Sequence, residues 1–259
     1  MWVKKVFICG DTVTGIYSGI YDAWKLMPKP GEVGIAIRGA VEQELFCEYV
    51  ETQESERKAI AVENLINKHL GYEAYWDLYH AILSADEKKG DVVLNTMLEA
   101  KEIPDSKKIM NHLKSPYVQK VFELSRAVGN EAHYFKEFLR FRELESGILF
   151  AKINPKSQVL TCIADHFANR LPLENWLVYD ETYRMVLVHE AKKQWILLVD
   201  ETMNLEKTKN LSETERTFET LWKGFCETIS IKERENKELQ RQHAPIWYRQ
   251  NMVEFTKEP

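Results

Sequence analysis

Residues Trp176–Val199 read WLVYDETYRMVLVHEAKKQWILLV and contain three short apolar runs separated by polar turns. The runs are Trp176–Tyr179, Met185–His189 and Trp195–Val199, and they are rich in the β-branched and aromatic residues that favour strands. The short polar turn Glu190–Lys193 between the last two runs is typical of a hairpin. This stretch predicts neighbouring strands with antiparallel pairing.

Further strands are predicted on the N-terminal side of this stretch. Gly147–Ile153 is the nearest of them, and a short helix over residues 159–169, ended by Pro172, is expected between it and Trp176. At the start of the sequence, Val3–Cys9 is typical of a buried strand that leads through a turn into a helix. Glu44–Glu51 is predicted to be a strand that pairs with it.

Between these two groups of strands, apolar residues recur with a helical period from Glu54 to about Leu139. The last long helix of this block is expected to begin at Ser115–Pro116, because serine caps helices and proline is tolerated in a first turn. After the strands, Ser212–Glu215 has capping-box spacing before an apolar helical stripe. A charged helix is predicted over Ile231–His243.

The sequence therefore predicts an α+β fold with a mostly antiparallel sheet. A helical block is inserted between the N-terminal and the C-terminal strands, and helices follow at the C-terminal end. We expect residues 1–259 to form a single unit, with about 54–140 as a candidate subdomain.

The amino-acid composition limits the classes to which the protein can belong. The chain has 259 residues, of which 44% are hydrophobic, so it has enough apolar material for a folded core. No apolar run approaches the roughly 18 residues of a membrane helix, and the first residues lack the apolar stretch of a signal peptide. We expect a soluble, cytoplasmic protein with no membrane partner. The formal charge of -5 argues against a uniformly basic nucleic-acid binder but is compatible with local basic patches.

The cysteines and the familiar motifs argue against resident metal or cofactor chemistry. Cys9, Cys47, Cys162 and Cys226 lie far apart, whereas zinc, redox and iron–sulfur sites usually include closely spaced cysteines. The P-loop, G-x-G-x-x-G, G-x-S-x-G and H-E-x-x-H signatures are missing. We therefore expect no metal, no cofactor and no independent catalytic activity.

The segment His133–Glu143 interleaves aromatic rings with cations and includes Arg140, Phe141 and Arg142. Such a mixture can stack bases and pair with phosphates at the same time. The alternative is a buried apolar stripe with a solvated charged face.

His166 and Arg170 are four residues apart in the predicted short helix, so they share a face. Together they can bind a phosphate or a carboxylate, and His166 can also transfer a proton near neutral pH. His166 is therefore the candidate catalytic residue, and the alternative is a structural, hydrogen-bonded histidine.

Asn236, Gln240 and His243 have helical spacing in the predicted C-terminal helix, and amide groups on one face can read base edges. The alternative is an exposed helix with pairs between glutamate and a cation. The candidates for binding nucleic acid or another anion are thus Arg140, Phe141, Arg142, His166, Arg170, Asn236, Gln240 and Arg241.

Four segments together resemble a bacterial family described as probable DNA metabolism proteins: FLRFR at 138–142, DHFANRLP at 165–172, WLVYD at 176–180 and QRQHAP at 240–245. Members of that family occur beside a radical S-adenosylmethionine protein, and related segments are fused to uracil-DNA glycosylase-type domains. The resemblance implies a function connected with DNA and a radical S-adenosylmethionine partner protein. It also points to six candidate site residues: Arg140, Phe141, His166, Arg170, Asp180 and Gln240.

Three functions follow as hypotheses. The first is a DNA-binding or DNA-repair accessory protein that acts with a radical S-adenosylmethionine partner. The second is an enzyme that processes a nucleotide or damaged base, with His166 as acid or base and with Arg170 and Asp180 nearby. The third is a protein-interaction scaffold with Trp247 and Tyr248 as anchors. The sequence does not set the oligomeric state.

Overall fold

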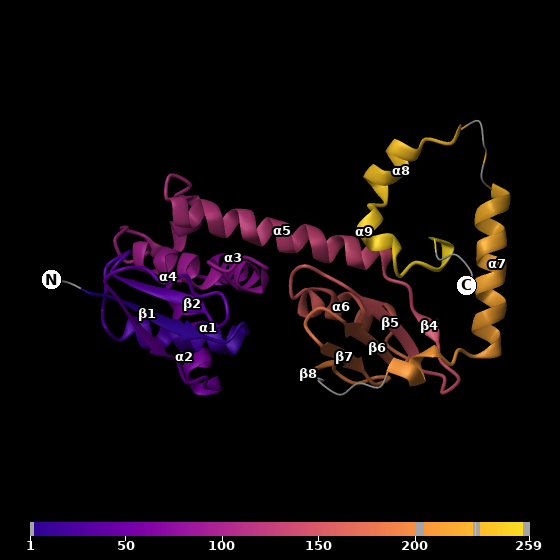
Figure 1. The fold of residues 1–259 in the computed structure, drawn as a ribbon, viewed down its shortest axis with the longest axis horizontal. Coiled ribbons are helices and arrows are strands. Elements are labelled where there is room, and N and C mark those ends of the chain that lie inside the picture. Colours follow the sequence, from indigo (N-terminus) through magenta and orange to yellow (C-terminus); the bar gives the residue numbers. More distant parts are fainter. Residues whose placement is uncertain (1–2, 200–204, 230, 232–233, 256–259) are drawn as a thin grey trace. The chain divides into compact units, whose positions relative to one another are not determined.

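The computed structural model describes residues 3–199, 205–229, 231 and 234–255 (Figure 1). The chain divides into two compact units, residues 1–129 and 130–259, and the boundary falls within helix α5 (Pro116–Phe138). We expected one unit with a helical subdomain, whereas the structure contains two units, each with its own sheet. The predicted α+β class is confirmed, because both units combine helices with a sheet.

The first unit contains a three-stranded parallel sheet in the order β2-β1-β3. Its strands are β1 (Lys4–Cys9), β2 (Val33–Ile37) and β3 (Cys47–Glu51). Phe7 on the central strand is paired with Ile35 on one side and Val50 on the other. Helix α1 provides the crossover that a parallel connection from β1 to β2 requires.

Helices enclose the core of this unit. They are α1 (Val13–Trp24), α2 (Glu56–His69), α3 (Tyr72–Leu83), α4 (Lys89–Glu99), the 3-10 helix η1 (Ser106–Asn111) and the first half of α5. Ile16, Leu78 and Met97 are among the buried side chains that α1, α3 and α4 contribute to one core. Ser115 caps α5 as predicted, since its hydroxyl accepts a hydrogen bond from the backbone N–H of Val118.

The sequence predictions for this sheet are partly confirmed. The predicted pairing of Glu44–Glu51 with the first strand is present, although β3 begins only at Cys47. Strand β2 was not predicted, because Gly34 interrupts its apolar run and glycine weakens a strand pattern. All pairing in this sheet is parallel, so the expected predominance of antiparallel pairing is wrong here.

The second unit contains a five-stranded mixed sheet in the order β4-β5-β6-β7-β8. Its strands are β4 (Arg142–Glu143), β5 (Leu149–Ile153), β6 (Trp176–Asp180), β7 (Met185–His189) and β8 (Ile196–Val199). Strands β6, β7 and β8 are antiparallel neighbours, which confirms the hairpin prediction. Strands β5 and β6 are parallel, contrary to expectation, because helix α6 (Leu160–Arg170) crosses between them.

Short helices and one long helix follow the sheet. They are η2 (Leu205–Lys209), α7 (Glu213–Ile229), α8 (Lys237–His243), α9 (Ile246–Arg249) and η4 (Val253–Phe255). Ser212 caps α7 as predicted, with its hydroxyl 3.0 Å from the backbone nitrogen of Glu215. The helix predicted over Ile231–His243 begins only at Lys237, since Asn236 has an extended backbone and caps α8. Residues 232 and 233 of that prediction lie outside the described residues.

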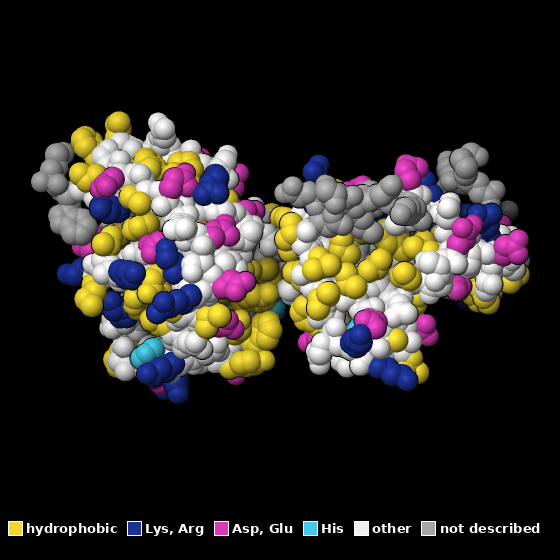
Figure 2. All heavy atoms as spheres, turned by 90° about the horizontal axis from the view of Figure 1, so that it is seen from below, with side chains coloured by type: hydrophobic (Ala, Val, Ile, Leu, Met, Phe, Trp, Pro, Cys, Tyr) yellow, Lys and Arg dark blue, Asp and Glu magenta, His cyan; other side chains and the backbone are white. Residues whose placement is uncertain are grey.

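The surface carries both signs of charge. Figure 2 shows one face of the molecule, where acidic and basic side chains are interspersed and hydrophobic side chains reach the surface between them. In the described part of the chain, no helix is long and apolar enough to cross a membrane.

Candidate anion-binding site

Two of the predicted arginines lie beside a cavity of the second unit. Arg140 follows α5, and Arg142 begins β4, where antiparallel pairing places it opposite Phe150 of β5. The cavity has a volume of about 330 Å³, which lies in the usual range of ligand pockets. Its lining consists of Arg140, Arg142, Phe150, Ala151, Lys152, Thr208, Lys209, Gln250, Asn251 and Val253.

The lining has one sign of charge. Among the described residues that line the cavity, four are cationic and none is acidic. Two arginines come from the β4 segment, Lys152 comes from β5 and Lys209 comes from η2. Cations from three segments that are far apart in the sequence therefore converge on one concave surface, which favours the binding of an anion.

Each of these cations also has a carboxylate partner, and none of the partners lines the cavity. The ion pairs are Arg140–Glu254, Arg142–Glu219, Lys152–Glu181 and Lys209–Glu206. The two arginine partners are the shielded ones, with side-chain exposures of 11% for Glu254 and 16% for Glu219. The exposed lysine pairs contribute little, because solvent screens them.

The arginine pairs orient the guanidinium groups without using all of their donors. Arginine has five N–H donors. Arg142 gives only its Nε–H to Glu219 among the described residues, so both of its Nη groups have no partner there. Arg140 donates from Nη2 to Glu254 at 2.9 Å and from Nη1 to the carbonyl of Glu137 at 3.1 Å. Both arginines are thus held beside the cavity, and Arg142 has donors left for a bound anion.

Amide side chains complete the lining. Gln250 and Asn251 follow α9 and offer both hydrogen-bond donors and acceptors. Asn251 is positioned by a hydrogen bond of 3.1 Å from its Nδ2 to Oδ1 of Asn154. Sequence reasoning missed these amides together with Lys152 and Lys209, because no local motif surrounds any of them. Only the strand pairing and the path of the C-terminal segment bring them together.

Phe141 is partly buried and packs against aromatic side chains of the core. Its ring centroid is 5.3 Å from that of Phe167 and 5.9 Å from that of Trp176. Trp176 is fully buried and stacks on His189 at 4.9 Å. Arg140 and Arg142 therefore line the cationic cavity, whereas Phe141 does not.

His166 and Arg170 lie on α6 as predicted, near Lys136 of α5. Partial burial, and then the charges of Lys136 and Arg170, lower the pKa of the His166 imidazole. Neither cation has an ion-pair partner among the described residues. The three residues therefore form a second basic cluster, with the histidine mostly neutral at pH 7. The described residues offer His166 no hydrogen bond, and the cavity beside Arg140 includes neither His166 nor Asp180, so the acid–base role stays a prediction.

Asp180 has a structural position at the end of β6. Its Oδ1 accepts hydrogen bonds from the backbone N–H groups of Thr182 and Tyr183, at 2.9 and 3.1 Å. Its Oδ2 is buried and has no hydrogen-bond partner among the described residues. Burial, aided by the charge of Glu131, raises the pKa of Asp180 to about 7, although the two backbone N–H groups lower it. This carboxyl group stabilises the turn between β6 and β7.

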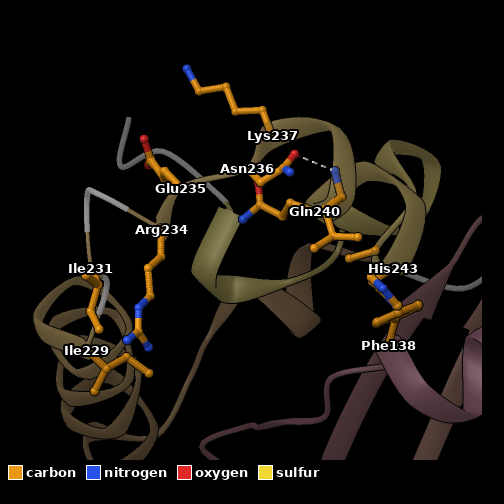
Figure 3. A pocket seen from close by; sticks show the side chains of 11 residues that line it. Phe138, Ile229, Ile231, Arg234, Glu235, Asn236, Lys237, Gln240 and His243 are labelled. Carbon is orange, nitrogen blue, oxygen red and sulfur yellow. Dashed lines mark hydrogen bonds between the residues drawn. The ribbon is translucent and has the colours of Figure 1, made fainter.

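The three residues of the predicted polar face in the C-terminal segment lie beside one cavity. Asn236, Gln240 and His243 all line an open cavity of about 600 Å³ (Figure 3), together with Phe138. Asn236 accepts a hydrogen bond of 2.9 Å from the backbone N–H of Leu239, drawn as a dashed line in Figure 3, because it is the cap of α8. Asn236, Gln240 and His243 therefore share one cavity, whereas the candidate Arg241 lies outside its lining.

The predicted anchors Trp247 and Tyr248 pack within the second unit. The ring of Tyr248 lies 5.0 Å from those of Tyr134 and Phe135. Trp247 donates from Nε1 to the carbonyl of Asn154 at 2.9 Å and remains 48% exposed. These contacts hold the segment that carries Gln250 and Asn251 in place, so the two aromatic residues support the cationic cavity.

A comparison with protein families gives a match that includes the residues of this site. A family model described as a domain of unknown function, DUF4130, matches residues 87–254, well over half of the chain. All the residues that line the cationic cavity fall in this range. No curated protein matches the chain. The chain belongs to the DUF4130 family.

Proposed function

We propose that the protein is a nucleic-acid-binding accessory protein whose second unit holds DNA phosphates in the cationic cavity. The observation that carries this proposal is a concave site with four cations and no acidic group among its described lining residues, in a chain with a formal charge of -5. Arginine and lysine supply most of the contacts that proteins make with nucleic-acid phosphates. The site offers two of each.

The basic cluster on α5 and α6 supports the same function. Lys136 and Arg170 have no ion-pair partner among the described residues, so their charges are available to a polyanion. A strand of DNA carries many phosphates, and binding strengthens with each one that the protein neutralises. In this proposal the cavity holds one phosphate firmly and the cluster adds non-specific attraction.

The accessory role and the DNA-repair context belong to the proposal as well. The resemblance to probable DNA metabolism proteins supports a radical S-adenosylmethionine protein as the partner. The wide cysteine spacing supports a division of labour, because iron–sulfur clusters usually need closely spaced thiolates. The partner would therefore supply the radical chemistry, and this chain would position the DNA.

A salt series of DNA-binding measurements tests this function. Fluorescence anisotropy with labelled single-stranded and duplex DNA should show affinity that falls as salt rises. Lys209→Ala removes an exposed lining cation, so it should fold normally and flatten the slope of log affinity against log salt by about 0.7 to 0.9. Arg142→Ala should weaken binding by about tenfold, since charged hydrogen bonds are worth about 1.5–3 kcal/mol.

Arg216→Ala is the matched control, because Arg216 is an exposed cation on α7 that does not line the cavity. It should bind DNA almost like the parent protein. Affinity without salt dependence, or equal losses for Arg216→Ala and Arg142→Ala, would contradict the proposal.

A further inference from the structure

A second cavity adjoins the cationic one. It has a volume of about 370 Å³, and it shares Arg140 and Val253 with the cationic cavity. Its other lining residues are Phe141, Glu215, Phe218, Glu219 and Trp222. Three of these seven lining residues are aromatic, so a space for a flat apolar group lies directly beside a space for an anion.

The aromatic residues of this cavity reach solvent. Phe218 is 61% exposed and Trp222 is 44% exposed, although both are large apolar side chains. They belong to the apolar stripe of α7, and Trp222 is stacked on Phe225 with ring centroids 5.8 Å apart. Exposed aromatic rings beside a cationic groove are the usual platform for unpaired bases, because every base has a flat π-face.

The charges in the two cavities differ in a way that orients a ligand. The aromatic cavity has two carboxylates in its lining, Glu215 and Glu219, whereas the described lining of the cationic cavity has none. Like charges repel, so a phosphate is favoured only in the cationic cavity. The carboxylates can accept hydrogen bonds from the amino group of a base, as acidic side chains do with cytosine.

The geometry points to a nucleotide site that spans both cavities, with the phosphate beside Arg140 and Arg142 and an unpaired base against Phe218 and Trp222. This inference rests on the proposed function and adds the kind of nucleic acid that is bound. A base that is paired in a duplex cannot enter the aromatic cavity, because it is stacked between its neighbours. The protein should therefore prefer single-stranded DNA or an extruded nucleotide, and a free mononucleotide has the same chemistry.

The decisive experiment compares a normal oligonucleotide with one that lacks a single base. Anisotropy should show that Trp222→Ala weakens binding to a short single-stranded cytosine oligonucleotide by about tenfold, since stacking on an aromatic side chain is worth about 1–3 kcal/mol per base. The same substitution should change affinity for the abasic analogue by less than about twofold. Arg142→Ala should weaken both, because both carry the phosphate.

Leu221→Ala is the matched control, because Leu221 is 62% exposed on the same helix and lines neither cavity. It should bind both oligonucleotides like the parent protein. If dCMP displaces the labelled oligonucleotide, a free nucleotide is enough to occupy the site. If only an unlabelled oligonucleotide displaces it, the ligand is a strand. Both outcomes support the site.

The outcomes separate the two proposals. If no DNA binds even at low salt, the proposed function fails. If DNA binds and Arg142→Ala weakens it, but Trp222→Ala has the same effect on abasic and normal oligonucleotides, only the nucleotide site is overturned. Equal affinity for blunt duplex and single-stranded DNA would overturn it too.

Discussion

Cationic side chains have different environments in the two units. In the first unit, Lys89 is only 1% exposed, and its ammonium group donates to the carbonyl of Ser84 at 2.7 Å and pairs with Asp11. In the second unit, the cations around the cavity stay accessible, and their carboxylate partners lie outside its lining. A buried, satisfied charge serves the fold, whereas an accessible cation with spare donors can serve a ligand. This contrast is the reason that the proposed anion site is assigned to the second unit.

The largest effect should come from breaking the buried pair of the first unit. Lys89→Ala removes the ammonium group, so the carbonyl of Ser84 stays buried without its donor and the ion pair with Asp11 is lost. We expect a loss of about 3 kcal/mol in the free energy of unfolding, measured by urea denaturation. Lys88→Ala is the control, since that side chain is 76% exposed and its loss should cost less than about 0.5 kcal/mol. If Lys89→Ala and Lys88→Ala were equally stable, the buried charge of Lys89 would not serve the fold, and the contrast with the accessible cations of the second unit would be lost.

A smaller effect should come from the second unit's own buried charge. Asp180 is fully buried with no ion pair among the described residues, so its folded pKa of about 7 lies above its ordinary value of 3.8. An acid with a raised pKa binds more protons when folded, so stability should fall as pH rises from about 4 to about 7. This shift corresponds to a penalty of about 4 kcal/mol at pH 8. Asp180→Asn should recover about half of it, because the asparagine amide group replaces Oδ2 at a buried position that has no hydrogen-bond partner among the described residues.

Urea denaturation of both proteins between pH 5 and pH 8 measures this effect. Asparagine keeps a side-chain oxygen for the N–H groups of Thr182 and Tyr183, so the turn should persist. Parallel pH profiles for the parent protein and Asp180→Asn would show that the buried carboxyl group does not titrate in this range.

The smallest effect should come from the exposed cluster on α6. Arg170→Ala removes one of the two cations that lower the pKa of His166, so this pKa should rise toward 6.5. An NMR titration of the imidazole measures the shift. Affinity for DNA should fall only about twofold to threefold, because exposed cations contribute little individually. A loss as large as that of Arg142→Ala would mean that the cluster and the cavity bind phosphate equally well.

The sequence predicted those parts of the fold that depend on local patterns. The hairpin within Trp176–Val199 and the caps at Ser115 and Ser212 were predictable, because alternation, turn residues and cap spacing act over a few residues. The parallel pairing of β5 with β6 was not, because it depends on how α6 crosses the sheet. Asn236 was placed inside a helix because the charged pattern continues around it, although asparagine favours a cap.

Only those site residues that lie close together in the sequence were predictable. Arg140 and Arg142 were identified from their aromatic and cationic surroundings, and both line the cavity. Lys152, Lys209 and Asn251 each have an ordinary sequence neighbourhood, and long-range pairing alone assembles them. The candidates Arg170 and Arg241 do not line the cavity beside Arg140, so the structure does not gather these three arginines around one cavity.

The Arg140–Glu254 pair joins residues that are 114 positions apart, and Gln250 and Asn251 beside it are also late in the chain. During synthesis, domains form from the N-terminal end onward. A ribosome-bound chain therefore lacks a complete cavity until the residues up to Glu254 have emerged from the exit tunnel. If the proposed function is right, a chain that is interrupted before these residues should not hold a phosphate in the cavity.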